Sequence, residues 1–185
     1  MTPAWMPMGY MLKQVARLPT WLANPDVADI CSVSGCISQP FADYTGHWRH
    51  NGHWFFDRPG TASDLAALED VDASGLTNFY YEAWPEEYDE ATASWSPLRA
   101  PADIPTEVQR PDAPQLLGFD VVTWSAGSGP ECSPLSCNLL AARLTVNQHC
   151  LFDSAEEAVA ALTAGLFNDS EPGPFRIVAV YQVAP

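Results

Sequence analysis

Basic residues are scarce in this sequence. The 185 residues include 8 Lys and Arg against 23 Asp and Glu, which gives a formal net charge of −15. Between Arg58 and Arg99 there are nine carboxylates and no Lys or Arg. A surface with this charge repels phosphate groups and anionic lipids, so the composition argues against binding to nucleic acids or to membrane surfaces.

Long apolar runs are also missing. No apolar stretch reaches about 18 residues, the length needed to suggest a membrane-spanning helix. The apolar residues at the start are interrupted by Pro3 and Pro7, and Lys13 follows them, whereas a signal peptide has its basic residues first. We therefore expect a cytoplasmic protein in which the five cysteines are reduced thiols.

Complete catalytic motifs are missing too. The sequence contains no Gly-rich dinucleotide fingerprint, no P-loop, no nucleophile-elbow serine and no HExxH pair. His149 is adjacent to Cys150, but neighbours on a strand point to opposite faces, so this pair does not predict a dyad. Cys132 lies in a Gly- and Pro-rich loop and is the better candidate for a nucleophile. The sequence predicts no catalytic residue.

The pattern of apolar residues predicts a single α+β domain with an antiparallel or mixed sheet and a few short helices packed on it. We expect the domain to cover residues 19–185, with residues 1–18 as a flexible amino-terminal extension and a Pro-rich connection around 85–115. A hairpin is expected at Asn51-Gly52. The expected helices are 63–71 and 153–165, and the expected strands are 26–38, 77–84, 116–125, 144–152 and 174–183.

Two pairs of cysteines share the spacing CSxxxC, at 31–36 and 132–137. Four thiolates from two such pairs could form a tetrahedral zinc site, so Cys31, Cys36, Cys132 and Cys137 are candidate metal ligands. A disulfide and plain buried thiols are the alternatives. The CSxxxC repeat and a GHW repeat at 46–48 and 52–54 are short and do not have the period of a solenoid.

Three of the four histidines are spaced three residues apart, at His47, His50 and His53. On a hairpin around Asn51-Gly52, the first and third could lie opposite each other and bind a metal ion. Trp48 and Trp54 flank the set, so packing against aromatic side chains is the alternative.

The acidic segment after residue 60 suggests a function in binding. Carboxylates interleaved with aromatic side chains can anchor and steer a basic protein partner, as an immunity or inhibitor protein does at the basic cleft of a toxin. The alternative is a metal-binding or reactive-cysteine protein, an enzyme or a redox sensor, that uses the CSxxxC segments. The candidate partner-binding residues are Asp64, Glu69, Asp70, Asp72, Tyr80, Glu82, Trp84, Glu86, Glu87, Tyr88, Asp89 and Glu90.

Overall fold

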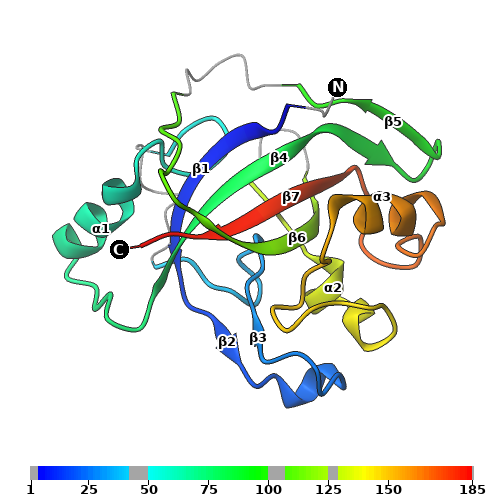
Figure 1. The fold of residues 1–185 in the computed structure, drawn as a ribbon, viewed down its shortest axis with the longest axis horizontal. Helices are drawn as coiled ribbons and strands as arrows, with labels where there is room; N and C mark the ends of the chain where they lie inside the picture. The colour runs from blue at the N-terminus through cyan, green and yellow to red at the C-terminus, as the bar shows by residue number, and fades with distance from the viewer. Residues whose placement is uncertain (1–3, 42–49, 100–106, 125–128, 185) are drawn as a thin grey trace.

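A five-stranded antiparallel sheet forms the centre of the protein, in a computed structural model that describes residues 4–41, 50–99, 107–124 and 129–184 (Figure 1). The strand order is β1-β4-β7-β6, and β5 pairs with the far end of β4. The strands of this sheet are β1 (Met6–Lys13), β4 (Thr77–Asp89), β5 (Ser94–Pro97), β6 (Gln115–Thr123) and β7 (Phe175–Gln182). The predicted α+β class is confirmed, and the sheet is antiparallel.

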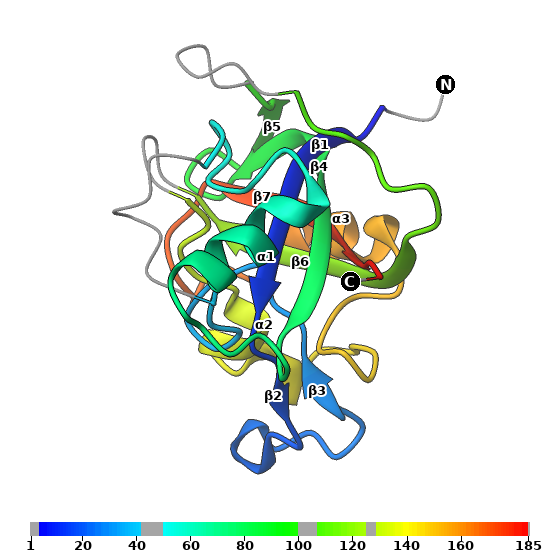
Figure 2. The ribbon, with the colours of Figure 1, turned by 90° about the vertical axis from the view of Figure 1, so that its left-hand side faces the viewer.

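A second, two-stranded sheet forms an arm that projects from one end of the molecule (Figure 2). It consists of β2 (Ala16–Arg17) and β3 (Asp29–Ile30), with the short helix η1 (Thr20–Leu22) between them. The other helices are α1 (Pro59–Leu68), α2 (Pro134–Cys137), η3 (Leu140–Ala142) and α3 (Ala155–Thr163). No helix in the described part of the chain has both the length and the apolar character needed to cross a bilayer.

The sheet and its helices form two units with the same order of elements. The amino-terminal unit runs β1, loop, α1, β4, and the carboxy-terminal unit runs β6, loop, α3, β7. The two units meet where β4 and β7 pair, with Tyr81 opposite Val180. Tyr81 also pairs with Gly9 on β1, and Val180 pairs with Gly118 on β6. This register relates the two units by an approximate two-fold axis between β4 and β7.

Each outer strand is covered by an equivalent loop. We call residues 51–57 the Asn51 loop and residues 147–153 the Asn147 loop. In each loop the Asn oxygen accepts from the backbone N–H groups two and four positions later, while its amide donates to a carbonyl of the outer strand and to an Asp six positions later. The two bonds to the Asn oxygen measure 2.9 and 3.2 Å in the Asn51 loop and 2.9 and 3.3 Å in the Asn147 loop. The bonds from the Asn amide to the strand carbonyl and to the Asp measure 2.8 and 2.8 Å in the Asn51 loop and 2.8 and 3.2 Å in the Asn147 loop.

Helices α1 and α3 differ in their first turn. Ser154 caps α3 by accepting a hydrogen bond from the backbone N–H of Glu157 at 3.2 Å, and the Glu157 carboxylate accepts from the N–H of Asp153 at 3.1 Å. Ser154 and Glu157 are the pair expected to form a capping box, although the carboxylate reaches the N–H of Asp153, one residue before the N-cap. Helix α1 begins at Pro59, four residues earlier than expected, because proline suits the first turn of a helix.

Three sequence predictions about extended segments need correction. Residues 6–13 do not belong to a flexible extension but form β1, where Met8 and Tyr10 are fully buried against β4. Of the expected strand 26–38 only β3 is extended, because Ser38 binds the N–H of Ser32 and curls the chain. The expected strand 144–152 is a turn held by Asn147, with one bridge to β6 at Phe152.

The sheet has a different character on its two faces, because side chains alternate along each strand. One face carries Tyr10 and Tyr80, whose hydroxyl groups bond to Gln109 and Glu82. The other carries Lys13 and Asp120, both of which are buried. The CSxxxC segments hydrogen-bond to these two charged residues.

Candidate thiol and histidine site

The side chain of Lys13 organises the first CSxxxC segment. Its ammonium nitrogen donates to the carbonyl oxygens of Ser32, Val33 and Ser34, each at 2.8 Å, and the residue is only 2% exposed. Burial lowers the pKa of Lys13 to about 7, against the attraction of Asp120. Three carbonyl acceptors match the three hydrogens of an ammonium and exceed the two of a neutral amine, so Lys13 is positioned as a buried cation.

Asp120 links both CSxxxC segments. Its carboxylate accepts from the hydroxyl of Ser32 at 3.0 Å, the backbone N–H of Val33 at 2.9 Å and the hydroxyl of Ser133 at 2.6 Å. Burial raises the pKa of Asp120 to about 6, and these three donors oppose that rise. Because the donors come from residues in both units, this one buried carboxylate holds the two cysteine segments side by side.

Two cysteines, Cys36 and Cys132, each contact a third, Cys137; we call these three residues the thiol cluster. The thiols of Cys36 and Cys132 both hydrogen-bond to Cys137, the last residue of α2. Cys36 is exposed, Cys137 is half-buried and Cys132 is buried. The sulfur of Cys36 also lies 3.2 Å from the carbonyl oxygen of Glu131, a second acceptor for its hydrogen. Solvent therefore reaches the cluster from the side of Cys36.

The hydrogen bonds give the three thiols different acidities. The bond from Cys132 lowers the pKa of the Cys137 thiol, and the backbone N–H of Ser133 and the Cys36 thiol add to this effect. The same bond raises the pKa of Cys132, which keeps its proton. Burial raises the pKa of Cys36, against the attraction of Lys13. Cys137 is therefore the thiol of the cluster that ionises first, and the thiolate is the nucleophilic form of cysteine.

Cys31, the fourth predicted ligand, lies apart from the thiol cluster. Its thiol bonds to the carboxylate of Asp29 at 3.4 Å, and Asp29 in turn contacts Nδ1 of His149 at 2.7 Å. Among the described residues, no group of three or more of the predicted cysteines places its sulfur atoms within mutual reach of one metal ion. The four-cysteine zinc site expected from the sequence is therefore not formed, because the curled segment turns Cys31 and Cys36 toward different partners.

The predicted histidine cluster is only partly covered by the described residues. His47 lies outside them. His50 stacks on Trp54 with the ring centroids 4.3 Å apart and the planes at 13°. His53 is 4% exposed, and burial, together with the charge of Arg176, lowers its pKa to about 4. His53 is thus a neutral core residue, and His50 takes the aromatic packing role that was the alternative to metal binding.

The predicted acidic docking segment divides into two parts. Four carboxylates are exposed on α1 and just after it: Asp64, Glu69, Asp70 and Asp72. On β4, only Glu86 of the predicted carboxylates is exposed, whereas Asp89 is half-buried. The aromatic residues Tyr80 and Tyr88 are 1% and 4% exposed and lie in the core, and half-buried Trp84 packs edge-on against Trp5. Tyr80 and Tyr88 are therefore not available to anchor a partner, because β4 lies inside the sheet.

Several carboxylates of this segment already have partners within the protein. Glu82 accepts from the hydroxyl groups of Tyr80 at 2.9 Å and Tyr181 at 3.3 Å. Glu87 pairs with Arg176 at 3.2 Å, and Glu90 accepts from the backbone N–H of Gly173 at 2.7 Å. These carboxylates stabilise the sheet, so the charge open to a partner is concentrated around α1.

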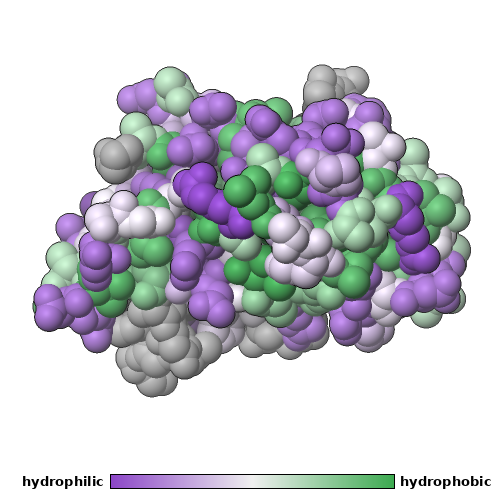
Figure 3. All heavy atoms as spheres, turned by 90° about the horizontal axis from the view of Figure 1, so that it is seen from below, coloured by the Kyte–Doolittle hydropathy of each residue, from purple (hydrophilic) through white to green (hydrophobic). Residues whose placement is uncertain are grey.

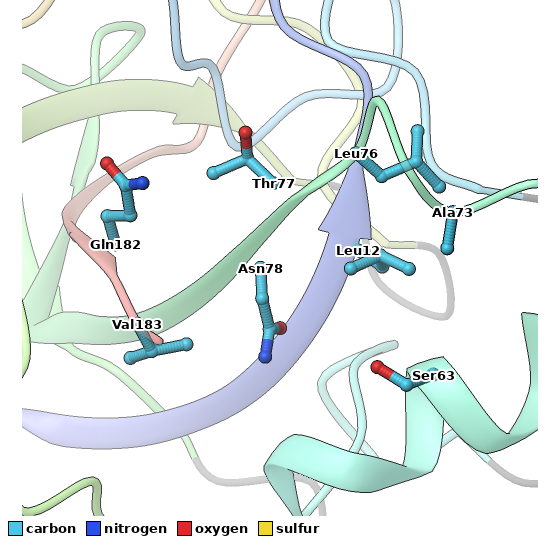
Figure 4. A pocket seen from close by; sticks show the side chains of 8 residues that line it. All are labelled: Leu12, Ser63, Ala73, Leu76, Thr77, Asn78, Gln182 and Val183. Atoms are coloured by element: carbon cyan, nitrogen blue, oxygen red, sulfur yellow. The ribbon is translucent and has the colours of Figure 1, made fainter. Parts of the chain in front are cut away.

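Two other surface features offer less chemistry. A cavity of about 180 Å³ lies between α1 and the ends of β1, β4 and β7 (Figure 4). It is smaller than typical ligand pockets of roughly 300–1,000 Å³, and its most buried polar group is the side chain of Asn78. The end of the molecule that bears the β2–β3 arm shows apolar and polar residues interspersed (Figure 3). Leu18 and Trp21 of the arm are both exposed.

Comparison of the chain with protein-family models, curated proteins and solved structures finds no match. Sequence analysis singled out the cysteines but missed Lys13, Asp120 and Asp29, which have no motif of their own. It also missed N-x-H-x-x-F-D, which occurs at 51–57 and again at 147–153 and marks the two units.

Proposed function

We propose that this protein is a thiol-based redox protein in which Cys137 is the reactive residue and Cys36 is its partner in a reversible disulfide. The observation that carries the proposal is the contact of two thiols with the sulfur of Cys137. Cys36 and Cys132 both donate to this sulfur, and Cys36, the partner in the proposed disulfide, is exposed. Low-pKa cysteines that are open to solvent and lie next to a second cysteine are typical redox sensors.

The chemistry requires a hydroperoxide as oxidant. The Cys137 thiolate attacks the distal oxygen of the hydroperoxide, which forms a sulfenic acid and releases an alkoxide or hydroxide that takes up a proton. The sulfur of Cys36 then attacks the sulfur of the sulfenic acid, and the hydroxyl group leaves as water. The product is a disulfide that links the first CSxxxC segment to α2, and two external thiols reduce it again.

The test is alkylation and peroxide oxidation of the reduced protein, followed by mapping of the modified peptides. At pH 7 we expect Cys137 to react with iodoacetamide about tenfold faster than an ordinary thiol, because most of it is ionised. After stoichiometric hydrogen peroxide we expect a Cys36–Cys137 disulfide. Cys137→Ser should abolish it, and Cys36→Ser should leave a trappable sulfenic acid.

Cys150→Ser is the matched control, because burial raises the pKa of the Cys150 thiol and the residue is 2% exposed. This variant should form the disulfide at the wild-type rate. A disulfide between Cys132 and Cys137 would overturn the role of Cys36. Equal alkylation rates for all accessible cysteines would overturn the proposal as a whole.

Docking of a basic partner remains a separate prediction, now confined to the exposed carboxylates around α1. A basic protein recovered from native lysate at low salt should be lost when Asp64, Glu69 and Asp72 are replaced by the corresponding amides. The variant Cys137→Ser should still recover it. Equal recovery by wild type and the amide variant would remove this prediction.

A further inference from the structure

We propose that Asp29, Cys31 and His149 form a binding site for one divalent transition-metal ion, with zinc as the best match. The site is separate from the thiol cluster, and the proposal does not depend on the redox function. It joins the two units, because Asp29 and Cys31 lie at and just after β3, whereas His149 belongs to the Asn147 loop.

The distances between the three ligand atoms suit a metal ion. The carboxylate oxygen of Asp29, the sulfur of Cys31 and Nδ1 of His149 all lie within 4.8 Å of one another. In a tetrahedral zinc site with bonds of roughly 2.0–2.3 Å, ligand atoms are separated by roughly 3.3–3.8 Å. The oxygen–sulfur distance of 3.4 Å already falls in this range, and the oxygen–nitrogen distance of 2.7 Å needs to open by only about half an ångström.

Backbone hydrogen bonds hold the two halves of the site in register. The N–H groups of Ala28 and Asp29 both donate to the carbonyl of Gln148, at 2.8 and 3.0 Å. The N–H of Cys31 donates to the carbonyl of His149 at 3.2 Å. Asn147 fixes the other side, because its oxygen accepts from the N–H of His149 at 2.9 Å. The three ligands are therefore placed by the backbone before any ion arrives, which reduces the ordering cost of binding.

The site is open on one side and closed on the other. The side chains of Asp29 and His149 are 17% and 20% exposed, while Cys31 is buried beneath them. Three protein ligands with one solvent-facing position are the arrangement of zinc sites that retain a water molecule. The mixed sulfur, nitrogen and oxygen set suits zinc or cobalt better than magnesium or calcium, which prefer oxygen ligands alone.

Gln148 can support the histidine when the metal is bound. The nitrogen of its side-chain amide lies 3.3 Å from Nε2 of His149, on the side of the ring away from Asp29. A metal ion at Nδ1 requires the proton to sit on Nε2, and a flip of the Gln148 amide then presents its oxygen as the acceptor. Such outer contacts orient a metal-bound imidazole, and their loss costs about 10–100-fold in affinity.

The test is a titration of the reduced, full-length protein with cobalt(II) in the absence of oxygen, followed by competition with zinc(II). Wild type should bind one equivalent of cobalt and show a thiolate-to-cobalt charge-transfer band that zinc removes. Cys31→Ser should abolish the band. Asp29→Asn and His149→Gln should weaken binding by at least about tenfold, because each removes a direct ligand, and Gln148→Ala should weaken it less.

Two control variants match the ligands in type and leave the site intact. Asp26→Asn removes an exposed carboxylate from the same segment, and Cys36→Ser removes a thiol of the neighbouring cluster; both should keep the wild-type band. The partly exposed positions Asp29 and His149 keep the test valid if Cys31→Ser fails to fold. Two results would overturn the proposal: no cobalt binding by wild type, or a band lost in Cys36→Ser and retained in Cys31→Ser.

Discussion

The Asn51 and Asn147 loops have the same backbone and different chemistry. Both place a histidine two positions after the asparagine, and both cover an outer strand through the same set of hydrogen bonds. His53 is buried next to Arg176 in the core. His149 instead reaches the carboxylate of Asp29 and lies next to the thiol of Cys31.

The difference shows which residues determine the backbone path of the loop and which determine its chemistry. The asparagine and the glycine of the outer strand fix the path of the chain in both units. The histidine lies on this path but does not determine it. The side chains that surround the histidine come from the other unit. The same loop structure and local sequence thus place a core residue in one unit and a candidate metal ligand in the other.

The largest effect is expected at the glycines of the outer strands. Gly9 and Gly118 have φ angles of +127° and +147°, and an added Cβ would lie 2.5 and 2.6 Å from the carbonyl oxygens of Phe56 and Phe152. Gly9→Ala and Gly118→Ala should each lower the free energy of unfolding by about 3 kcal/mol or more, through backbone strain and overlap. Urea denaturation measures both.

Gly60→Ala is the control for this pair, because a Cβ there meets nothing within 4 Å. It should leave stability unchanged or raise it by up to about 1 kcal/mol, since alanine favours a helix. If only one of the two strand glycine variants loses stability, the two loops do not contribute equally to the free energy of unfolding.

The next effect concerns the asparagines. Asn51→Ala and Asn147→Ala each remove four hydrogen bonds and leave backbone groups without partners, so each should cost about 2–3 kcal/mol. The loss should be greater at Asn51, which is 4% exposed, than at half-buried Asn147. Denaturation curves measure both losses. A loss at Asn147 equal to or greater than that at Asn51 would contradict the difference in burial. Asn147→Ala should also weaken cobalt binding, whereas Asn51→Ala should not.

An effect of similar size, confined to low pH, follows from the titration of His53. Its pKa is about 4 in the folded protein, against about 6.5 in an unfolded chain, so the unfolded state binds more protons between these values. Its contribution to stability is present above pH 6.5 and is lost as the pH falls toward 4, on the order of 3 kcal/mol in total. His53→Gln should flatten the dependence of unfolding free energy on pH in this window. Gly60→Ala, which changes no titratable group, should keep the wild-type slope.

The smallest effect distinguishes the ends of the two helices. After α1 the chain turns at Asp70 with φ +56°, and after α3 it turns at Gly165 with φ +72°. Asp70→Gly should raise the free energy of unfolding by about 0.5–1 kcal/mol, because glycine adopts this conformation without strain and a carboxylate near a helix carboxyl end is unfavourable. Gly165→Asp should lower it. Thermal melts in matched buffer measure both, and opposite signs are the required result.

Local patterns in the sequence determined much of the fold. The capping box at Ser154 and Glu157 predicted α3, and the runs of apolar residues predicted β6 and β7, because these signals depend on neighbours along the chain. Two other segments were predicted less well. Side chains of Ser38 and Asn147 bond to the nearby backbone, so 26–38 and 144–152 curl although their apolar content favours strands.

Tertiary structure decided the chemistry of the site. The sequence singled out four cysteines as one group, but the pairing of β4 with β7 and the bonds to Asp120 brought Cys36 to Cys137 and left Cys31 with His149. Residues so far apart in the chain meet only when the register of the whole sheet is fixed, because a shift of one residue turns every side chain to the other face. The sequence by itself determined which reactive groups are present, and only the folded sheet determined which of them are neighbours.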